Sequence, residues 1–344
     1  MRIAFVRHSF LNRGGDKIVA EYASYLADAG HDVSIKSNVV DTVFELSSNV
    51  ALERFNIFGK FGTILSLLTR KIEADIIVAD IIALSFLLYL KNGHKVFYFA
   101  QDYNENIYQN FLQKLFIRGL YALGLSYFRI PVISVSDELA TVFVDRFGIS
   151  PVVVRNGINI KTFYNDPDKS LLATKKGKVV LFFSRRDYRK GFDLALKTLN
   201  SVSRDKSNSI EAWTVGEPLM AGELDCPVHN FGYVAEKEMR QILSSADLFL
   251  YPSRFEGFGL MVLEAFACGC PVVTTKAIQY AVNEKNALVS PIDDVESLAH
   301  NVLRLMSDEK LAKKLTDEAA HYVTDYTLER SAKLFEKALL TMRE

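Results

Sequence analysis

Short apolar runs alternate with longer segments of helical periodicity from the beginning of the chain. Residues 3–6 form an apolar run, and Ile18, Tyr22, Leu26 and Ala29 then recur at the spacing of one helix face. Further short runs rich in β-forming residues occur at 32–36, 75–79, 95–100, 132–136 and 152–154. Strands that alternate with helices in this way predict a parallel sheet joined by crossover helices.

A polar stretch at 164–178 interrupts this alternation and is the best linker candidate. The pattern then restarts, with strands expected at 178–183, 210–215, 248–251 and 271–275 and helices at 192–202 and 260–267. We therefore predict an α/β protein with two doubly wound, Rossmann-like domains, 1–162 and 163–327. The last helix, 328–344, has an apolar face that allows packing on either domain, including a return to the first. Ligands of such sheets bind at the carboxyl ends of the strands, so a cleft between two facing domains is the expected site.

Composition narrows the class of protein without identifying one. The 344 residues are 49% hydrophobic and carry no net charge at pH 7, which argues against broad nucleic-acid binding. Three cysteines, Cys226, Cys268 and Cys270, lack the spacing of a disulfide framework or a zinc site. The N-terminal residues lack the apolar core of a signal peptide, and no run approaches the ~20 apolar residues of a membrane span. We expect a cytoplasmic protein.

The stretch 252–265 carries the most informative chemical pattern, because it follows a strand and opens a helix. Gly257 and Gly259 let the backbone approach a ligand, and the helix that begins near Gly259 offers free N–H groups to an anion. Glu256 precedes this helix and Glu264 lies in its second turn, so both carboxylates can accept hydroxyl hydrogen bonds from one sugar ligand. In the alternative interpretation, Glu256 caps the helix and Glu264 is a surface carboxylate. The apolar neighbours of Glu264 argue against a surface position.

A cluster of cations follows the first strand of the second series. Arg185, Arg186, Arg189 and Lys190 lie within six residues. Such a cluster can neutralise a diphosphate, whose negative charge grows as it departs in a group transfer. The alternative is a solvated loop of charges, which is common.

Two more loops follow strands of the first series. Residues 12–15 (Asn-Arg-Gly-Gly) contain neither the G-x-G-x-x-G fingerprint of dinucleotide binding nor the ending of a P-loop. Gly14 and Gly15 form either a ligand-binding turn or an ordinary strand-to-helix turn. Gln101 and Asp102 follow the strand at 95–100, and Asp102 is either a general base or a loop carboxylate.

The run E-G-F-G-L-x-x-x-E at 256–264, followed by A-C-G-C-P-V-V-T, resembles the signature of the retaining glycosyltransferases of family 4, which have the GT-B fold. The similarity is strong over about 180–305 and weaker before 150. It implies two Rossmann-like domains facing a central cleft, with a nucleotide-diphosphate sugar as the donor substrate.

The resemblance also implies roles for individual residues. Glu264 would bind the nucleotide ribose, and Glu256 would contact the donor sugar and is the first catalytic candidate. The implied donor contacts also include Gly15, Arg185, Lys190, Phe258, Gly259 and Leu260, and the implied acceptor contact is Gly14. Many family members carry a histidine where this chain has Gln101-Asp102, and Asp102 is the second catalytic candidate. The Q-D-Y run is similar to one in rhamnosyltransferase-like members, which implies a deoxysugar donor.

The activity implied by the resemblance is that of a retaining, hexosyltransferase-type enzyme. It would transfer a hexose or deoxyhexose from a UDP-, GDP- or dTDP-linked sugar to a glycan or lipid-linked acceptor in polysaccharide or glycolipid biosynthesis. No cofactor and no metal ion is expected, because fixed cations can stabilise the departing diphosphate. Two alternatives remain open: a sugar-nucleotide epimerase of the same fold, and a non-catalytic sugar-nucleotide binding protein.

Residues 106–136 contain no acidic side chain, whereas Lys114, Arg118 and Arg129 lie among many aromatic and aliphatic residues. A basic amphipathic segment of this kind can lie on an anionic membrane surface. One interpretation is therefore peripheral contact with the inner membrane face through 106–136. The other is a buried crossover helix whose charged side chains reach water.

Overall fold

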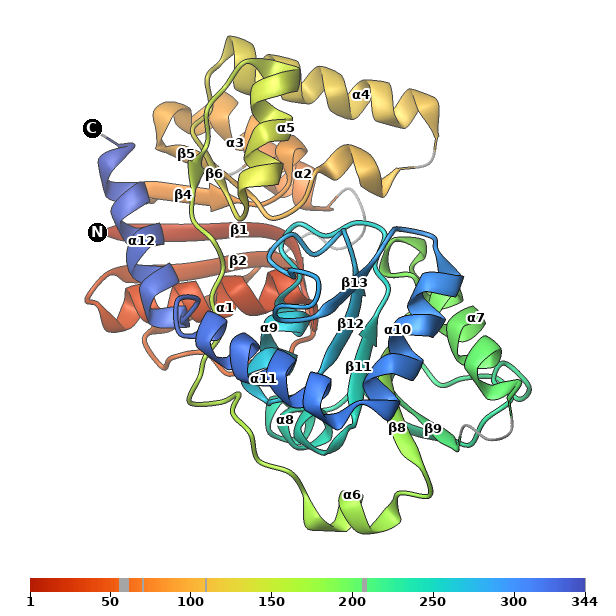
Figure 1. Ribbon diagram of the computed structural model, residues 1–344. Helices are drawn as coiled ribbons and strands as arrows, with labels where there is room; N and C mark the ends of the chain where they lie inside the picture. The colour runs from red at the N-terminus through yellow and green to blue at the C-terminus, as the bar shows by residue number, and fades with distance from the viewer. Residues whose placement is uncertain (56–61, 70, 109, 206–208, 344) are drawn as a thin grey trace. The chain divides into compact units, whose positions relative to one another are not determined.

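The computed structural model describes residues 1–55, 62–69, 71–108, 110–205 and 209–343 (Figure 1). The chain divides into two compact units. Unit 1 comprises Met1–Gly157 together with Leu328–Glu344, and unit 2 comprises Ile158–Thr327. Each unit is built around its own parallel sheet, so the expected α/β class is confirmed.

Unit 1 contains, among its described residues, a seven-stranded sheet in the order β3-β2-β1-β4-β5-β6-β7. The strands are β1 (Arg2–Phe10), β2 (Asp32–Val40), β3 (Val50–Arg54), β4 (Ile76–Ala79), β5 (Val96–Ala100), β6 (Val132–Ser134) and β7 (Val152–Val153). All residues of β4 and β5 are buried, as expected for central strands that have helices on both faces. The chain order of the strands reverses between β1 and β4.

Helices connect the strands of unit 1. They are α1 (Gly14–Asp28), α2 (Gly62–Thr69), α3 (Ile82–Asn92), α4 (Phe111–Tyr121) and α5 (Asp137–Phe147), with the short turns η1 (Gly93–Lys95) and η2 (Asn104–Ile107) and the π-helical η3 (Ala122–Tyr127). The last helix of the chain, α12 (Leu328–Thr341), also belongs to unit 1. Its Phe335 ring lies 4.7 Å from the ring of Tyr22 and 5.0 Å from that of Phe99. This aromatic contact decides between the two packing positions that the sequence left open.

Unit 2 contains, within the described ranges, a six-stranded sheet in the order β10-β9-β8-β11-β12-β13. Its strands are β8 (Lys178–Ser184), β9 (Ile210–Gly216), β10 (Val228–Gly232), β11 (Leu248–Tyr251), β12 (Val272–Thr275) and β13 (Leu288–Ser290). Its helices are α6 (Lys169–Thr174), α7 (Phe192–Ser203), α8 (Glu236–Ser245), α9 (Leu260–Ala267), α10 (Val295–Ser307) and α11 (Glu309–Val323), with the turn η4 (Tyr188–Lys190). Here the chain order of the strands reverses between β8 and β11.

The two chain segments that connect the units lie side by side. The N–H of Ile158 donates to the carbonyl of Tyr326 at 2.9 Å, and Ile158 pairs with Thr327 in a short parallel bridge. The division therefore falls after Gly157, earlier than the position after residue 162 expected from the sequence. The polar stretch 164–178 is part of unit 2, since the N–H of Asp168 donates to the Ser245 hydroxyl of α8 at 2.9 Å.

Candidate functional site

The two candidate loops of unit 2 begin at the reversal point of its sheet. Residues 185–191 follow β8, and residues 252–259 follow β11. Because β8 and β11 are parallel neighbours, their carboxyl ends lie at the same edge of the sheet. In doubly wound sheets this reversal point is where ligands bind.

Backbone contacts hold the two loops of unit 2 together. The Ser253 hydroxyl and the N–H of Arg254 both donate to the carbonyl of Arg189 at 2.8 Å. Gly191 has φ +68°, and a Cβ atom at this position would lie 1.9 Å from the carbonyl oxygen of Pro252. Only glycine allows so close an approach, and the approach brings Lys190 next to Glu256.

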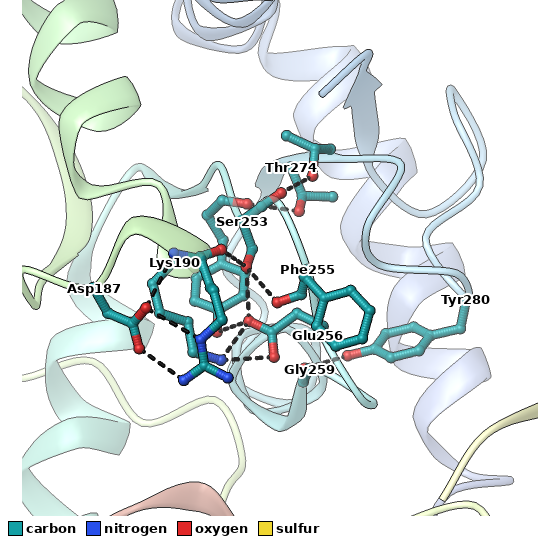
Figure 2. Close-up of polar contacts among 11 residues, drawn as sticks. Asp187, Lys190, Ser253, Phe255, Glu256, Gly259, Thr274 and Tyr280 are labelled. Carbon is teal, nitrogen blue, oxygen red and sulfur yellow. Dashed lines mark hydrogen bonds and ion pairs between the residues drawn. The ribbon is translucent and has the colours of Figure 1, made fainter. Parts of the chain in front are cut away.

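Glu256 is held by three donors (Figure 2). The Lys190 ammonium lies 2.8 Å from each of its carboxylate oxygens. The Tyr251 hydroxyl donates to Oε1 at 2.7 Å, and the Ser253 hydroxyl donates to the same oxygen at 2.9 Å. Burial, and next the charge of Glu256, raise the pKa of Tyr251 well above its usual value, so its hydroxyl stays a proton donor.

Glu256 does not serve as the cap residue of α9, which was one interpretation of the sequence. The cap position is Gly259, whose φ of +89° is left-handed. A Cβ atom there would lie 2.4 Å from Cδ1 of Ile278, and the Tyr280 hydroxyl donates to the Gly259 carbonyl at 2.5 Å. The neighbouring Phe258 ring packs 5.2 Å from that of Tyr280. The backbone that enters α9 at Leu260 is therefore held in one conformation.

Glu264 is a buried carboxylate, because only 2% of its surface is exposed. The interpretation of Glu264 as a surface residue is therefore wrong. Burial raises the pKa of Tyr280, and the charges of Glu256 and Glu264 both raise it further. Both glutamates thus act electrostatically on the same tyrosine.

The four cations after β8 differ in their partners. Arg186 forms two hydrogen bonds of 2.8 and 2.9 Å with Glu223, and Arg189 lies 2.9 Å from Asp187. Lys190 is bound to Glu256. The half-buried side chain of Arg185 forms no hydrogen bond or ion pair with any other residue that the structure describes. The charge pattern did not distinguish the four cations, and the resemblance singled out Arg185 and Lys190; the fold leaves the Arg185 side chain available to a ligand.

Arg254 is a structural residue that the sequence analysis did not single out. Its guanidinium binds Asp193 at 2.7 and 2.8 Å and Asp293 at 2.6 Å, and it lies 3.9 Å from the centre of the Tyr188 ring. The hydrogen bond to Asp193 is the main reason that the pKa of Arg254 is raised. Arg254, which lies in the loop after β11, therefore links this loop to the loop after β8 through Tyr188 and to α7 through Asp193. Nothing in the local sequence distinguishes it from the other arginines of this region.

Unit 1 gathers a second set of polar residues where its strand order reverses. The Gly15 carbonyl accepts hydrogen bonds from Arg7 at 2.9 Å and from Gln101 at 3.1 Å. Arg7 also lies 2.9 Å from Asp16 and 2.7 Å from Asp80. Burial raises the pKa of Asp16, and the Arg7 charge opposes this effect. The carboxyl ends of β1, β4 and β5 thus hold the predicted glycine turn in place.

Gly14 and Asp102 flank this second set. Gly14 is the first residue of α1, after the cap residue Arg13. Asp102 is half-buried beyond the end of β5, and its backbone carbonyl accepts a hydrogen bond of 3.4 Å from Tyr98.

The sequence analysis did not identify Arg7 and Asp80 as members of this set. The signal was a charged residue inside or just after an otherwise apolar strand.

The described residues contain no group of three or more histidine, cysteine, aspartate or glutamate side chains placed to hold a metal ion. Within the same residues, no helix has both the length and the apolar character needed to cross a membrane.

Comparison with known proteins identifies the segment that holds both loops of unit 2. Residues 177–308 match the family described as glycosyl transferases group 1. The chain carries a glycosyl transferases group 1 domain. This domain includes Arg185, Lys190, Glu256 and Glu264.

Relatives and solved structures extend the similarity beyond this domain. The N,N'-diacetylbacillosaminyl-diphospho-undecaprenol alpha-1,3-N-acetylgalactosaminyltransferase of Campylobacter jejuni is 27% identical over 73% of this chain and 70% of its own. Sucrose-phosphate synthase from Thermosynechococcus elongatus superimposes with a TM-score of 0.81 at 18% identity, over 99% of this chain and 98% of its own. The Anabaena protein Alr3699/HepE, solved with UDP-glucose, gives a TM-score of 0.80 at 18% identity, over 99% and 100%. The fold is GT-B, as expected, and the group 1 similarity is located in unit 2.

Proposed function

We propose that the protein is a retaining glycosyltransferase that transfers a hexose or deoxyhexose from a nucleotide-diphosphate sugar to a glycan or lipid-linked acceptor. One observation carries the proposal. At the reversal point of the group 1 domain, Glu256 is bound by Lys190, and Glu264 is buried in α9, which begins at Leu260 directly after the glycine turn. Carboxylates with fixed positions suit hydroxyl recognition, and adjacent cations suit a diphosphate.

The donor diphosphate is assigned to Arg185, Lys190 and the backbone at Phe258, Gly259 and Leu260. The first turn of α9 has N–H groups without partners inside the helix, and these groups favour an anion. As the bond to the sugar breaks, negative charge builds on the leaving diphosphate. Fixed donors and cations stabilise that charge more in the transition state than in the ground state.

The sugar and the ribose are assigned to the two glutamates. Glu256 binds hydroxyls of the donor sugar, and its own orientation is set by Lys190, Tyr251 and Ser253. Glu264 binds the ribose hydroxyls. An ionised carboxylate has four lone-pair positions, so Glu256 can accept from a sugar while it keeps its present donors.

The acceptor is assigned to unit 1. Gly14 contacts the acceptor, Gly15 contacts the donor phosphate, and Asp102 acts as a base or orients the acceptor hydroxyl. Retention of configuration would follow from attack on the face that the diphosphate leaves, with a phosphate oxygen taking the proton of the acceptor hydroxyl. In this scheme the fixed cations make a metal ion unnecessary.

The comparisons support the substrate classes in the proposal. The Anabaena structure of the same fold holds UDP-glucose, and the name of the Campylobacter jejuni relative contains a diphospho-undecaprenol-linked sugar. We accordingly propose UDP-, GDP- or dTDP-linked sugars as donors, with a deoxysugar suggested by Gln101-Asp102, and a reaction on the cytoplasmic side of the membrane.

A thermal-shift screen tests the donor site. UDP, GDP, dTDP and ADP, alone and as their common sugar conjugates, are added to the wild type, to Glu264→Gln and to Asp317→Asn, an exposed control in the same unit. A ligand that binds only the folded state raises the melting temperature in proportion to the logarithm of its concentration over Kd. We expect one base to raise it in the wild type and the control, but not in Glu264→Gln. No shift with any nucleotide, or an equal shift in all three proteins, would contradict the assignment.

Turnover assays test the chemistry with the donor found in this screen. Transfer to an added acceptor, with an α-linked product from an α-linked donor by NMR, supports the retaining mechanism. A β-linked product overturns retention, and conversion of the donor without an acceptor supports the epimerase alternative. Activity that survives EDTA supports the absence of a metal requirement, and its loss and recovery with a divalent cation would contradict it.

A further inference from the structure

Helix α4 has apolar side chains on two faces. One face packs into unit 1 through Ile117 and Tyr121, which are 4% and 0% exposed. The other face turns outward: Phe111 is 74% exposed, Leu112 70%, Leu115 53% and Phe116 65%. Figure 1 shows α4 as an outer helix of unit 1. The helix is therefore buried on one side only, so the interpretation of 106–136 as a fully buried crossover helix does not account for its outward face.

The outward face belongs to a firmly held helix. The side chain of Asn110 caps α4 by accepting from the N–H groups of Leu112 and Gln113 at 2.8 and 3.3 Å. The Tyr121 hydroxyl bonds to Tyr98 at 2.9 Å and accepts from the N–H of Asn104 at 3.0 Å. The fold thus presents the four apolar side chains to solvent in a defined arrangement.

Arg118 adds a further attachment to the same unit. Its Nε donates to Glu105 at 3.2 Å, and this hydrogen bond lowers the pKa of Glu105. Glu105 itself is only 5% exposed. The acidic residue nearest to α4 in the sequence is therefore buried, and the positive charge of Arg118 offsets its negative charge. It does not repel an anion at the surface.

The charges around the outward face favour a lipid occupant over a protein. No acidic residue occurs from 106 to 136, whereas Lys114 and the exposed Arg129 remain besides Arg118. The exposed ring of Tyr127 follows in η3, and aromatic side chains of this amphipathic type concentrate at membrane interfaces. An outward apolar helix face with flanking cations and no acids is typical of segments that lie in the interface of an anionic bilayer.

We propose that the α4 surface, consisting of Phe111, Leu112, Leu115 and Phe116 with Lys114 and Arg129, binds anionic bilayers. The apolar side chains enter the boundary between headgroups and acyl chains, while the two cations contact lipid phosphates. None of these residues is assigned to the donor or the acceptor, so the inference does not depend on the proposed reaction. It adds a second binding activity, which would hold the enzyme where lipid-linked acceptors are found.

Vesicle flotation of the full chain tests the proposal. The vesicles contain phosphatidylcholine alone or phosphatidylcholine with phosphatidylglycerol, and the nucleotide sugar is omitted. We expect the wild type to float only with phosphatidylglycerol and to be released by high salt, because exposed charges are screened. Absence of flotation with anionic vesicles at low salt would overturn the proposal.

Paired variants locate the binding surface. The double variant Phe111→Ser and Phe116→Ser should lower the vesicle partition coefficient by about tenfold or more, given the apolar area it removes. Lys114→Ala with Arg129→Ala should remove the preference for phosphatidylglycerol. The matched control is Met220→Ser with Tyr233→Ser, which removes two similarly exposed side chains (64% and 74%) from unit 2. Equal loss in the control, or wild-type flotation of the phenylalanine variant, would contradict a site on α4.

Two further measurements keep the outcomes distinct. Circular dichroism and the nucleotide thermal shift should be unchanged in the phenylalanine variant, because both rings are exposed and lie in unit 1. A failure of donor binding in the wild type would thus affect the proposed function and leave this inference standing. Analytical ultracentrifugation completes the test: a dimer that forms in the wild type and dissociates in the phenylalanine variant would assign the surface to a second copy of the chain and overturn the lipid proposal.

Discussion

The ammonium of Lys190 lies 2.8 Å from both carboxylate oxygens of Glu256, although 66 positions separate the two residues in the chain. The contact exists because the loops after β8 and β11 leave neighbouring strands at the same sheet edge. The Lys190 side chain is 26% exposed and that of Glu256 only 7%. The pair is therefore partly desolvated and open on the lysine side.

This pair should be needed for turnover more than for folding. We expect Glu256→Gln and Lys190→Met each to lower kcat by about 10²–10³, the usual cost of losing one electrostatic contact to a transition state. The double variant should be little worse than either single one, because the two residues act as a unit. Tyr251→Phe, which removes one donor to Glu256, should lose less. Steady-state kinetics with the cognate donor checks this, and a wild-type kcat in either single variant would exclude the role.

Arg185 and Arg186 should behave differently despite being adjacent. Arg185→Ala removes a cation that forms no side-chain hydrogen bond or ion pair in the described structure, so it should lower kcat/KM by about 10²-fold if it meets the diphosphate. Arg186→Ala removes an exposed ion pair to Glu223, and such pairs contribute about 0–1 kcal/mol to stability. Kinetics and urea unfolding of both variants test the difference. Equal kinetic losses would mean that the whole cluster acts together.

Gly259 should be far less replaceable than another glycine of the same conformation. Gly259→Ala faces both a left-handed φ of +89° and a Cβ contact of 2.4 Å with Ile278. Gly222→Ala has a similar φ of +81° with open space around it, so it isolates the backbone penalty. We expect about 1–2 kcal/mol of destabilisation for Gly222→Ala and about 1–3 kcal/mol more for Gly259→Ala. Urea unfolding measures both, and Ile278→Val should recover part of the difference by removing Cδ1.

The last helix should be essential to unit 1. Phe335 is fully buried against Phe5, Tyr22 and Phe99, so Phe335→Ala should cost about 3–5 kcal/mol. Leu334→Ala, at the neighbouring and 46% exposed position, should change stability little. Thermal unfolding followed by hydrogen exchange of β1 and β5 amides checks that the loss occurs in unit 1. A loss confined to unit 2 would contradict the observed packing.

Glu105 should make unit 1 sensitive to acid. The hydrogen bond from Arg118 is the largest influence on its pKa and lowers it, whereas burial opposes this effect. Because the folded-state pKa lies below the unfolded value, the stabilisation is complete above the ordinary glutamate pKa of about 4.3 and is lost as the pH falls through the folded value. Glu105→Gln should therefore flatten the acid limb of the stability curve. An unchanged acid limb would mean that other carboxylates control it.

Local patterns were sufficient for the fold class and for the chemistry-bearing segments. Apolar periodicity is a property of neighbouring residues, so it predicted the strands near 178–183 and 248–251 and the helix near 260–267 close to their observed bounds. The same periodicity predicted an end of the first strand after residue 6, which is too early. In the structure β1 continues to Phe10, because Arg7 is buried against Asp16 and Asp80 and Phe10 pairs with Val40 of β2.

The sequence by itself determined that this is an α/β protein with a group 1 pattern around Glu256 and Glu264. Only the tertiary structure decided that Lys190 binds Glu256, that Arg186 is engaged by Glu223 while Arg185 is not, that α12 packs on unit 1, and that α4 turns apolar side chains to solvent. The physical reason is the same in each case. Periodicity and turn chemistry act between residues a few positions apart, whereas these contacts depend on which strands become neighbours and which helix faces their packing leaves uncovered.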